Sequence, residues 1–90
     1  MTGAQRRQAV FDPDFLEDLV YWIRTDRKRT LRILKLVEAT VREPFEGVGK
    51  PEALRGDLAR RWSRRIDREH RLVYQVSAER VYFLAARYHY

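Results

Sequence analysis

The apolar residues of this chain change their spacing near the middle, from a helical repeat in the first half to an alternating repeat in the second. Apolar residues three and four positions apart share one face of a helix, whereas apolar residues two positions apart share one face of a strand. The first half is therefore expected to form helices, and the chain from about Leu58 onward to form strands. This order predicts an α+β fold in which two N-terminal helices pack on an antiparallel β-sheet.

Helix-start and helix-stop signals set the bounds of the two expected helices. The first is expected from Pro13 to about Thr25, because Asp12 can cap it and a proline fits its first turn. The second is expected to begin after the cap residue Asp26 and to end before Pro44, since proline disfavours helical geometry in the residue before it. The stripes expected to face the sheet are Phe15, Leu16, Leu19, Val20 and Ile23 in the first helix, and Leu31, Leu34, Val37 and Val41 in the second.

The expected strands follow from alternation and from aromatic and β-branched residues. The segments 58–66, 71–76 and 81–90 are predicted to form an antiparallel meander with turns at 67–70 and 77–80, and 9–11 could add a short first strand. Residues 1–8 are polar and aperiodic, so we expect a flexible N-terminal extension followed by one domain over residues 9–90. In the first strand of the meander, Trp62, Arg64 and Ile66 alternate with Arg61, Ser63, Arg65 and Asp67.

Charge and composition narrow the classes of function. The net charge is +6, and lysine occurs only at positions 28, 35 and 50, so 16 of the 19 basic residues are arginine. This bias suits phosphate recognition, but a GC-rich genome would give the same bias. The absence of cysteine excludes disulfides, thiolate zinc sites and thiol nucleophiles. The sequence offers neither an apolar run of about twenty residues nor a secretory signal, so a cytoplasmic protein without a membrane partner is expected.

A basic and aromatic segment carries the candidate chemistry. Seven arginines lie between Arg55 and Arg71, and aromatic residues that could stack on bases lie within or beyond this segment. The alternative is that Trp62, Tyr74 and Phe83 belong to the core and that the arginines form a solvated strand face. Composition and spacing leave both interpretations open.

Five motifs make the chain resemble the YoeB family of toxins, within the RelE-like messenger-RNA interferases. They are Pro44-Phe-Glu-Gly, Gly49-Lys-Pro-Glu52, Trp62-Ser-Arg-Arg-Ile66, Glu69-His-Arg-Leu-Val-Tyr74 and Arg87-Tyr-His-Tyr90, in this order and at the family's spacing. The resemblance runs from about Val10 to Tyr90. It implies a microbial RNase-type fold with the active site on the open face of the sheet.

The resemblance also implies roles for individual residues. Glu52 matches the general base, His89 the general acid and Arg71 the transition-state stabiliser, with Tyr90 as a supporting residue. The expected RNA-binding residues are Lys50, Arg55, Trp62, Arg64 and Arg65. Two positions depart from the family, which usually has lysine in place of Arg55 and proline in place of Ala53. Because arginine stays charged, Arg55 could hold phosphate but could not move a proton, and reduced activity is expected.

These residue types suit RNA cleavage by attack of the 2′-hydroxyl. The reaction needs a base, an acid and a cation beside the phosphorane, and Glu, His and Arg supply them without a metal or another cofactor. Each residue also has a plainer interpretation. Glu52 could be a solvated carboxylate, Arg71 could pair with Asp67 or Glu69 across the turn, and His70 is expected to be a surface imidazole.

The resemblance implies partners as well as an activity. The expected partners are messenger RNA in the ribosomal A site and a cognate antitoxin of the YefM/Phd type, with a toxin dimer as a further expectation for the antitoxin complex. The second hypothesis is a module that binds the ribosome or the antitoxin without cleaving RNA. A topoisomerase inhibitor of the related ParE branch is a third hypothesis, which the Glu52 and His89 pair disfavours.

Overall fold

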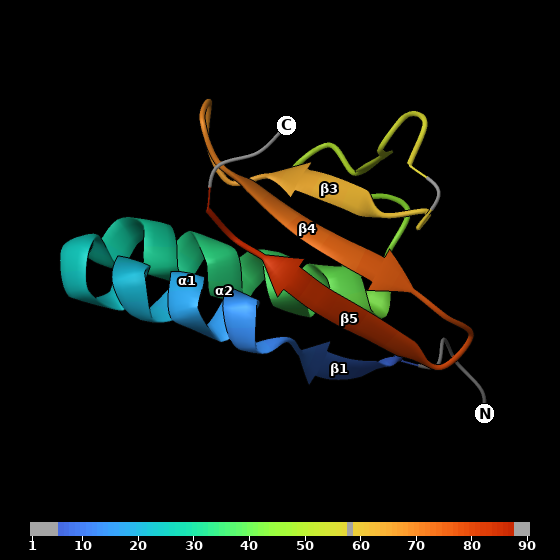
Figure 1. The fold of residues 1–90 in the computed structure, drawn as a ribbon, viewed down its shortest axis with the longest axis horizontal. Helices are drawn as coiled ribbons and strands as arrows, with labels where there is room; N and C mark the ends of the chain where they lie inside the picture. Colours follow the sequence, from blue (N-terminus) through green and yellow to red (C-terminus); the bar gives the residue numbers. More distant parts are fainter. Residues whose placement is uncertain (1–5, 58, 88–90) are drawn as a thin grey trace.

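The computed structural model describes residues 6–57 and 59–87 of the chain. Two helices and five strands follow one another in the order β1, α1, α2, β2, β3, β4, β5 (Figure 1). Their bounds are β1 Gln8–Phe11, α1 Pro13–Thr25, α2 Arg27–Arg42, β2 Glu52–Ala53, β3 Trp62–Arg65, β4 Arg71–Val76 and β5 Arg80–Ala85. The predicted α+β class is confirmed.

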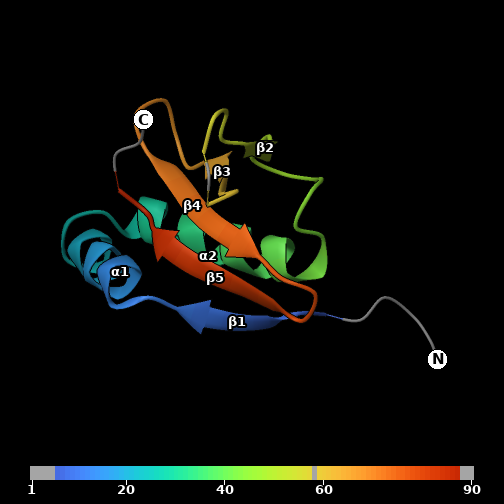
Figure 2. The same ribbon diagram turned by 45° about the vertical axis from the view of Figure 1, so that its right-hand side comes forward.

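The five strands form one sheet in the order β1-β5-β4-β3-β2. Strands β2 to β5 pair antiparallel, as expected for the meander, but β1 pairs parallel to β5. The predicted antiparallel sheet is therefore confirmed for β2 to β5, and the possible first strand joins it in parallel at the β5 edge. In Figures 1 and 2 the two helices lie against the sheet and connect β1 at one edge with β2 at the opposite edge. The meander that starts at β2 then ends with β5 beside β1.

Side-chain caps explain why both helices begin where the sequence predicts. The carboxylate of Asp12 accepts a hydrogen bond from the backbone N–H of Asp14 at 3.0 Å, and that of Asp26 accepts one from Arg29 at 3.0 Å. Each bond satisfies one of the amides that the first turn of a helix leaves without a partner. Helix α1 ends at Thr25, as predicted, and α2 ends at Arg42, two residues before Pro44.

The buried faces of the helices differ from the predicted stripes. Helix α1 buries Phe15 and Trp22, and α2 buries Ile33 and Leu36 among others, against the aromatic and aliphatic residues of β4 and β5. The predicted stripes left out Trp22, Ile33 and Leu36, although Trp22 lies seven positions after Phe15 and so shares its face. The residues predicted to be buried that are in fact exposed are Leu16, Val20, Ile23, Leu31 and Leu34.

The N-terminal boundary and the start of β3 also differ from the prediction. Strand β1 begins at Gln8, whose backbone N–H donates to the carbonyl oxygen of Glu79 at 2.9 Å, and Arg7 donates to that of Val41 at 3.1 Å. Residues 7 and 8 are thus tied to the fold, while the expectation for residues 1–5 lies outside the described residues. Strand β3 begins at Trp62 rather than near Leu58. In the described part of the chain, no helix has the length and apolar character needed to cross a membrane.

Candidate active site

Arg71 lies at the centre of a cluster on the sheet face that the helices leave open. It is the first residue of β4, and its Nη1 donates a hydrogen bond to the Oγ of Ser63 in β3 at 3.0 Å. The same nitrogen lies 3.9 Å from Oε1 of Glu52 in β2. Glu52 pairs with Ser63 in the β2–β3 register, which places both on one face. The structure therefore brings together two of the predicted catalytic residues, Glu52 and Arg71, over a serine that the sequence analysis did not single out.

Arg65 lies directly opposite Arg71 in the β3–β4 register. Side chains directly opposite one another in an antiparallel pair share a face, and like charges in this arrangement are destabilising. Arg65 is exposed and Arg71 is half-buried. Two arginines held in this way favour an anion between or above them, because it would relieve their repulsion.

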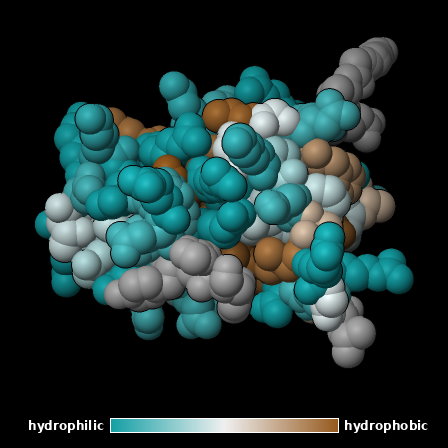
Figure 3. All heavy atoms as spheres, turned by 90° about the horizontal axis from the view of Figure 1, so that it is seen from above, coloured by the Kyte–Doolittle hydropathy of each residue, from teal (hydrophilic) through white to brown (hydrophobic). Residues whose placement is uncertain are grey.

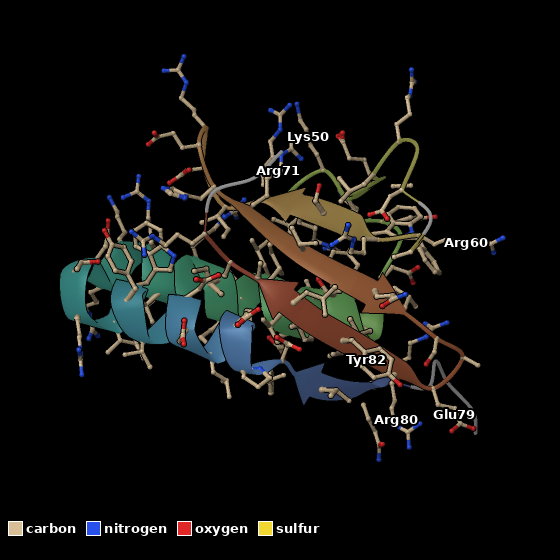
Figure 4. All side chains as sticks on the ribbon, viewed as in Figure 1. Lys50, Arg60, Arg71, Glu79, Arg80 and Tyr82 are labelled. Carbon is tan, nitrogen blue, oxygen red and sulfur yellow. The ribbon has the colours of Figure 1, made fainter. Side chains whose placement is uncertain are left out.

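The loop before β2 brings Lys50 close to this cluster. The backbone N–H of Arg65 donates to the carbonyl oxygen of Gly49 at 2.7 Å, so the loop runs beside the end of β3. Gly49 and Lys50 both have positive φ angles, of 88° and 52°. Figure 4 shows the side chains of Lys50 and Arg71 near the same end of β3. Arg55 is exposed in the segment after β2, but no contact within the described residues ties it to Arg71.

Arg64 is buried, so the prediction that it binds RNA is wrong. Its side chain is 0% exposed, and its guanidinium donates to the carbonyl oxygens of Glu43, Glu46 and Val48. Its Nε also donates to the hydroxyl of Tyr74, which itself donates to the carbonyl oxygen of Pro44 at 2.7 Å. The buried side chain of Arg64, which lies on β3, therefore holds the loop after α2 in place through hydrogen bonds.

Trp62 lies on the same inner face of the sheet as Arg64. It pairs with Tyr74 in the register, packs against the hydrophobic core, and its ring centroid lies 5.0 Å from that of Phe45. This placement contradicts a role for Trp62 as a stacking surface on the Arg71 face. The alternation of β3 already carried this information, because it put Trp62 and Arg64 on the face opposite Ser63 and Arg65.

His70 is a packed residue rather than a surface imidazole, so that prediction is also wrong. Its side chain is 6% exposed, and its ring meets that of Trp22 edge to face with centroids 4.7 Å apart. The guanidinium of Arg29 also lies against the Trp22 ring, 5.0 Å from its centroid. The other histidine, His89, and Tyr90 lie outside the described residues, and the structure does not place them.

Asp67 organises the turn between β3 and β4. Its carboxylate accepts hydrogen bonds from the backbone N–H groups of Glu69 and His70, both at 2.8 Å, and it pairs with Arg29 of α2. Burial alone would raise the pKa of Asp67, but the hydrogen bonds from Arg29 and from the two backbone amides outweigh it and hold the pKa below 3.8. Asp67 is thus engaged by Arg29, and Arg71 has Glu52 as its acidic neighbour rather than Asp67 or Glu69.

The surface that carries Arg71 is hydrophilic and basic. Figure 3, seen from above the view of Figure 1, shows hydrophilic side chains over most of the side that carries β3 and the neighbouring turns. Over residues 6–57 and 59–87, no group of three or more histidine, aspartate or glutamate side chains is arranged to hold a metal ion. The described cluster offers cations for an anion and one carboxylate, Glu52, within reach of them.

Comparisons with known proteins place this sequence and fold among bacterial toxins. A family model described as a YoeB-like toxin of bacterial type II toxin-antitoxin systems matches residues 11–90. Toxin RelK of Mycobacterium tuberculosis is 52% identical over 84 residues, which cover 93% of this chain and 99% of that protein. The YoeB dimer from Staphylococcus aureus superposes with a TM-score of 0.86 at 38% identity, covering 96% of this chain and 100% of that chain.

A second structure from Staphylococcus aureus, a heterotetrameric YoeB-YefM toxin-antitoxin complex, superposes with a TM-score of 0.81 at 38% identity and the same coverage. The fold is thus shared with toxins of type II toxin-antitoxin systems. Within that class, the chain belongs to the YoeB family.

Proposed function

We propose that the chain is an endoribonuclease that cleaves messenger RNA in the ribosomal A site without a metal ion. The observation that carries this proposal is the arrangement of Glu52 and Arg71, 3.9 Å apart on neighbouring parts of the open sheet face, with Arg65 directly opposite Arg71. A base and two cations in this arrangement match what a phosphodiester needs at its reacting centre.

The reaction begins at the 2′-hydroxyl beside the bond that is cut. Glu52 accepts the proton of this hydroxyl, and the oxygen attacks the adjacent phosphorus in line with the departing 5′ oxygen. Arg71 and Arg65 stabilise the additional negative charge on the phosphorane, because a guanidinium binds phosphate oxygens through two parallel hydrogen bonds. The products are a 2′,3′-cyclic phosphate and a 5′-hydroxyl.

The remaining roles rest on the resemblance to the family. His89 donates the proton to the departing 5′ oxygen, and Tyr90 supports this step. Lys50, exposed beside the end of β3, holds a phosphate of the bound strand. Arg55 remains charged and binds phosphate without moving a proton, so the turnover is expected to be lower than with a lysine at this position.

An antitoxin of the YefM type is the proposed protein partner, and a toxin dimer is the proposed form within the complex. Relatives from Staphylococcus aureus occur as a YoeB dimer and as a YoeB-YefM heterotetramer. A net charge of +6 attracts an acidic disordered segment, which can fold over the basic face and cover Arg65 and Arg71.

The proposal is tested by mapping RNA ends with primer extension in a reconstituted translation reaction. The wild-type chain is compared with Glu52→Gln, Arg71→Ala and His89→Ala, and with Glu17→Gln as a matched control for the loss of an exposed carboxylate on α1. The wild type and the control are expected to cut within codons in the A site. The three site variants are expected to lose at least about 100-fold in rate, the range for groups that act in acid–base or charge stabilisation.

Two outcomes would contradict the proposal. If translation stops without new RNA ends, the chain is a binding module that blocks the ribosome. If the wild type and Glu52→Gln cut at equal rates, Glu52 is not the base and the proposed chemistry is wrong. Circular dichroism of each variant separates these outcomes from a failure to fold.

A further inference from the structure

A basic hollow extends from the Arg65 and Arg71 pair toward the β3–β4 turn. It has a volume of about 420 Å³ and is lined by Arg32, Arg65, Ile66, Asp67, Arg68 and Arg71. The first of these residues comes from α2, so the hollow extends the open sheet face onto a helix. None of the roles given above for RNA cleavage uses Arg32 or Arg68.

The charge of the hollow is not balanced by its own acid. The carboxylate of Asp67 is engaged by Arg29 and by two backbone amides, as described above. In the described parts of the chain, no carboxylate forms an ion pair with Arg32, Arg65 or Arg68. Four guanidinium groups therefore line a space in which the single carboxylate is already neutralised, and this arrangement favours a bound anion.

Arg32 is held in position before any ligand arrives. Its side chain is half-buried, and its Nη2 donates a hydrogen bond to the carbonyl oxygen of Arg65 at 3.2 Å. This contact uses one of the five N–H groups of a guanidinium and leaves the others for a ligand. Because part of its conformational freedom is already lost, Arg32 binds an anion at a lower entropic cost than a fully mobile surface arginine.

The shape and polarity of the hollow suit a phosphate group. Guanidinium groups and one carboxylate line it together with apolar side-chain atoms, and the one apolar residue among its lining residues, Ile66, is largely buried. Arginine forks match phosphate oxygens, and the hollow shares Arg65 and Arg71 with the proposed reacting centre. A ligand that fills both sites would thus carry successive phosphates, as an RNA strand does.

We propose that Arg32 and Arg68, together with Arg65, form a second phosphate subsite that holds a phosphodiester of RNA next to the reacting centre. The proposal rests on the proposed nuclease function and adds to it a phosphate-binding site beside the reacting centre. The phosphodiester comes either from the message that flanks the cleaved bond or from ribosomal RNA, and these two sources share the same chemistry.

The test measures RNA affinity as a function of salt concentration. Fluorescence anisotropy follows binding of a short single-stranded RNA that carries 2′-O-methyl groups and therefore cannot be cleaved. Each phosphate contact in a single strand contributes a slope of about 0.7 in a plot of log affinity against log salt. The variants are Arg32→Ala, Arg68→Ala and the double variant, with Arg24→Ala, an exposed arginine of α1, as a matched control.

The double variant is expected to lower the slope by about 0.7 in total and the affinity at low salt by about 10-fold, since it removes one phosphate contact. Arg32→Lys retains the charge and is expected to retain the slope. Arg24→Ala is expected to reduce both quantities by less. Thermal unfolding of each variant shows whether loss of the Arg32 contact to Arg65 has destabilised the chain. If it has, the result for Arg68→Ala alone decides.

A second arm separates the two sources by measuring binding to ribosomes without a message. If the double variant binds the oligonucleotide normally but binds empty ribosomes less tightly, the subsite holds ribosomal RNA. If both affinities equal those of Arg24→Ala, the subsite does not exist. The outcome is independent of cleavage: a wild type that binds through Arg32 but cuts no message would retain the subsite and overturn the nuclease.

Discussion

The backbone of Ala86 is held by α1 from two sides, and the contact with Asp18 is the more exposed of the two. The carboxylate of Asp18 accepts a hydrogen bond from the N–H of Ala86 at 2.9 Å, and the indole of Trp22 donates to its carbonyl oxygen at 2.8 Å. These contacts fix the end of β5 on the helix. The carboxylate makes a charge-assisted bond, which is stronger than one between neutral groups.

Asp18→Ala is therefore expected to lower the free energy of unfolding by about 1.5–3 kcal/mol, the range for a hydrogen bond to a charged group. Asp18→Asn retains an acceptor oxygen and is expected to lose less. Urea denaturation measures both, and hydrogen exchange at the Ala86 amide should accelerate in Asp18→Ala. Unchanged exchange at this amide would show that Asp18 does not hold the strand.

Arg64 is expected to determine stability rather than RNA affinity. Its fully buried guanidinium serves three carbonyl oxygens and one hydroxyl, and a lysine ammonium cannot reproduce this planar set of donors. Arg64→Lys should destabilise the chain by about 2–4 kcal/mol, because buried acceptors lose their partners. Arg65→Lys, on the exposed face, serves as the control and should change the unfolding midpoint little. A midpoint for Arg64→Lys equal to that of the wild type would contradict the structural role.

Gly49 is expected to tolerate no side chain. Its φ of 88° is unfavourable for other residues, and a Cβ atom there would lie 3.0 Å from Cδ2 of Leu36 and 3.2 Å from Cβ of Arg64. Gly49→Ala should therefore cost more than the roughly 1 kcal/mol of backbone strain alone. Gly56→Ala is the matched control, because φ there is 72° but a Cβ atom would meet no other atom within 4 Å. Equal thermal midpoints for the two variants would show that the close packing around Gly49 is not limiting.

Stability should fall in acid partly because of Asp67. A carboxyl whose folded-state pKa lies below its unfolded value stabilises the fold fully above the unfolded value, about 4, and loses this contribution as the pH falls through the lowered pKa. Asp67→Asn should therefore weaken the dependence of unfolding free energy on pH below about 5. A residual dependence is expected from Asp26 and Asp57, whose pKa values are lowered by a hydrogen bond from the Arg29 backbone N–H and by the Arg61 side chain, respectively. Identical curves for the variant and the wild type would contradict this assignment.

Replacing Arg65, which lies opposite Arg71, should change the stability of the chain and its RNA affinity in opposite directions. Because Arg65 and Arg71 lie directly opposite one another on β3 and β4, Arg65→Gln should raise the free energy of unfolding of the unliganded chain by roughly 0.2–1 kcal/mol. The same variant should bind RNA less tightly, since it lacks a phosphate contact. Thermal melts and anisotropy measure the two effects, and a variant that is less stable as well as weaker in binding would contradict the repulsion.

Local signals predicted the bounds of the helices, whereas contacts between distant segments were not predictable. Asp12 and Asp26 fix the starts of α1 and α2 through hydrogen bonds within a few residues, which a sequence pattern contains. The parallel pairing of β1 with β5 and the packing of His70 on Trp22 depend on the path of the whole chain, which no local pattern contains.

The residues of the candidate site were likewise predictable only in part. Motif matching placed Glu52 and Arg71, and the structure brings them within 3.9 Å. The motif around Trp62 also carried Arg64, which is buried, because a motif records which residues occur together and not which face of a strand they occupy. Ser63 and Arg32 were not singled out because the resemblance to the family gave neither of them a role, although the alternation in β3 put Ser63 on the face of Arg65.

The parallel pairing of β1 with β5 has a consequence for how the protein is made. Gln8 pairs with Arg80, and β5 also supplies Val81 and Phe83 to the core against which both helices pack. A ribosome synthesises β1 first and β5 last of the five strands, so β1 has no neighbouring strand until β5 has emerged. Contacts between residues this far apart in sequence form late and slowly. A chain on which β5 has not yet been synthesised therefore lacks the strand to which β1 and β4 both pair, and the sheet that carries Arg71 is completed only once β5 has emerged.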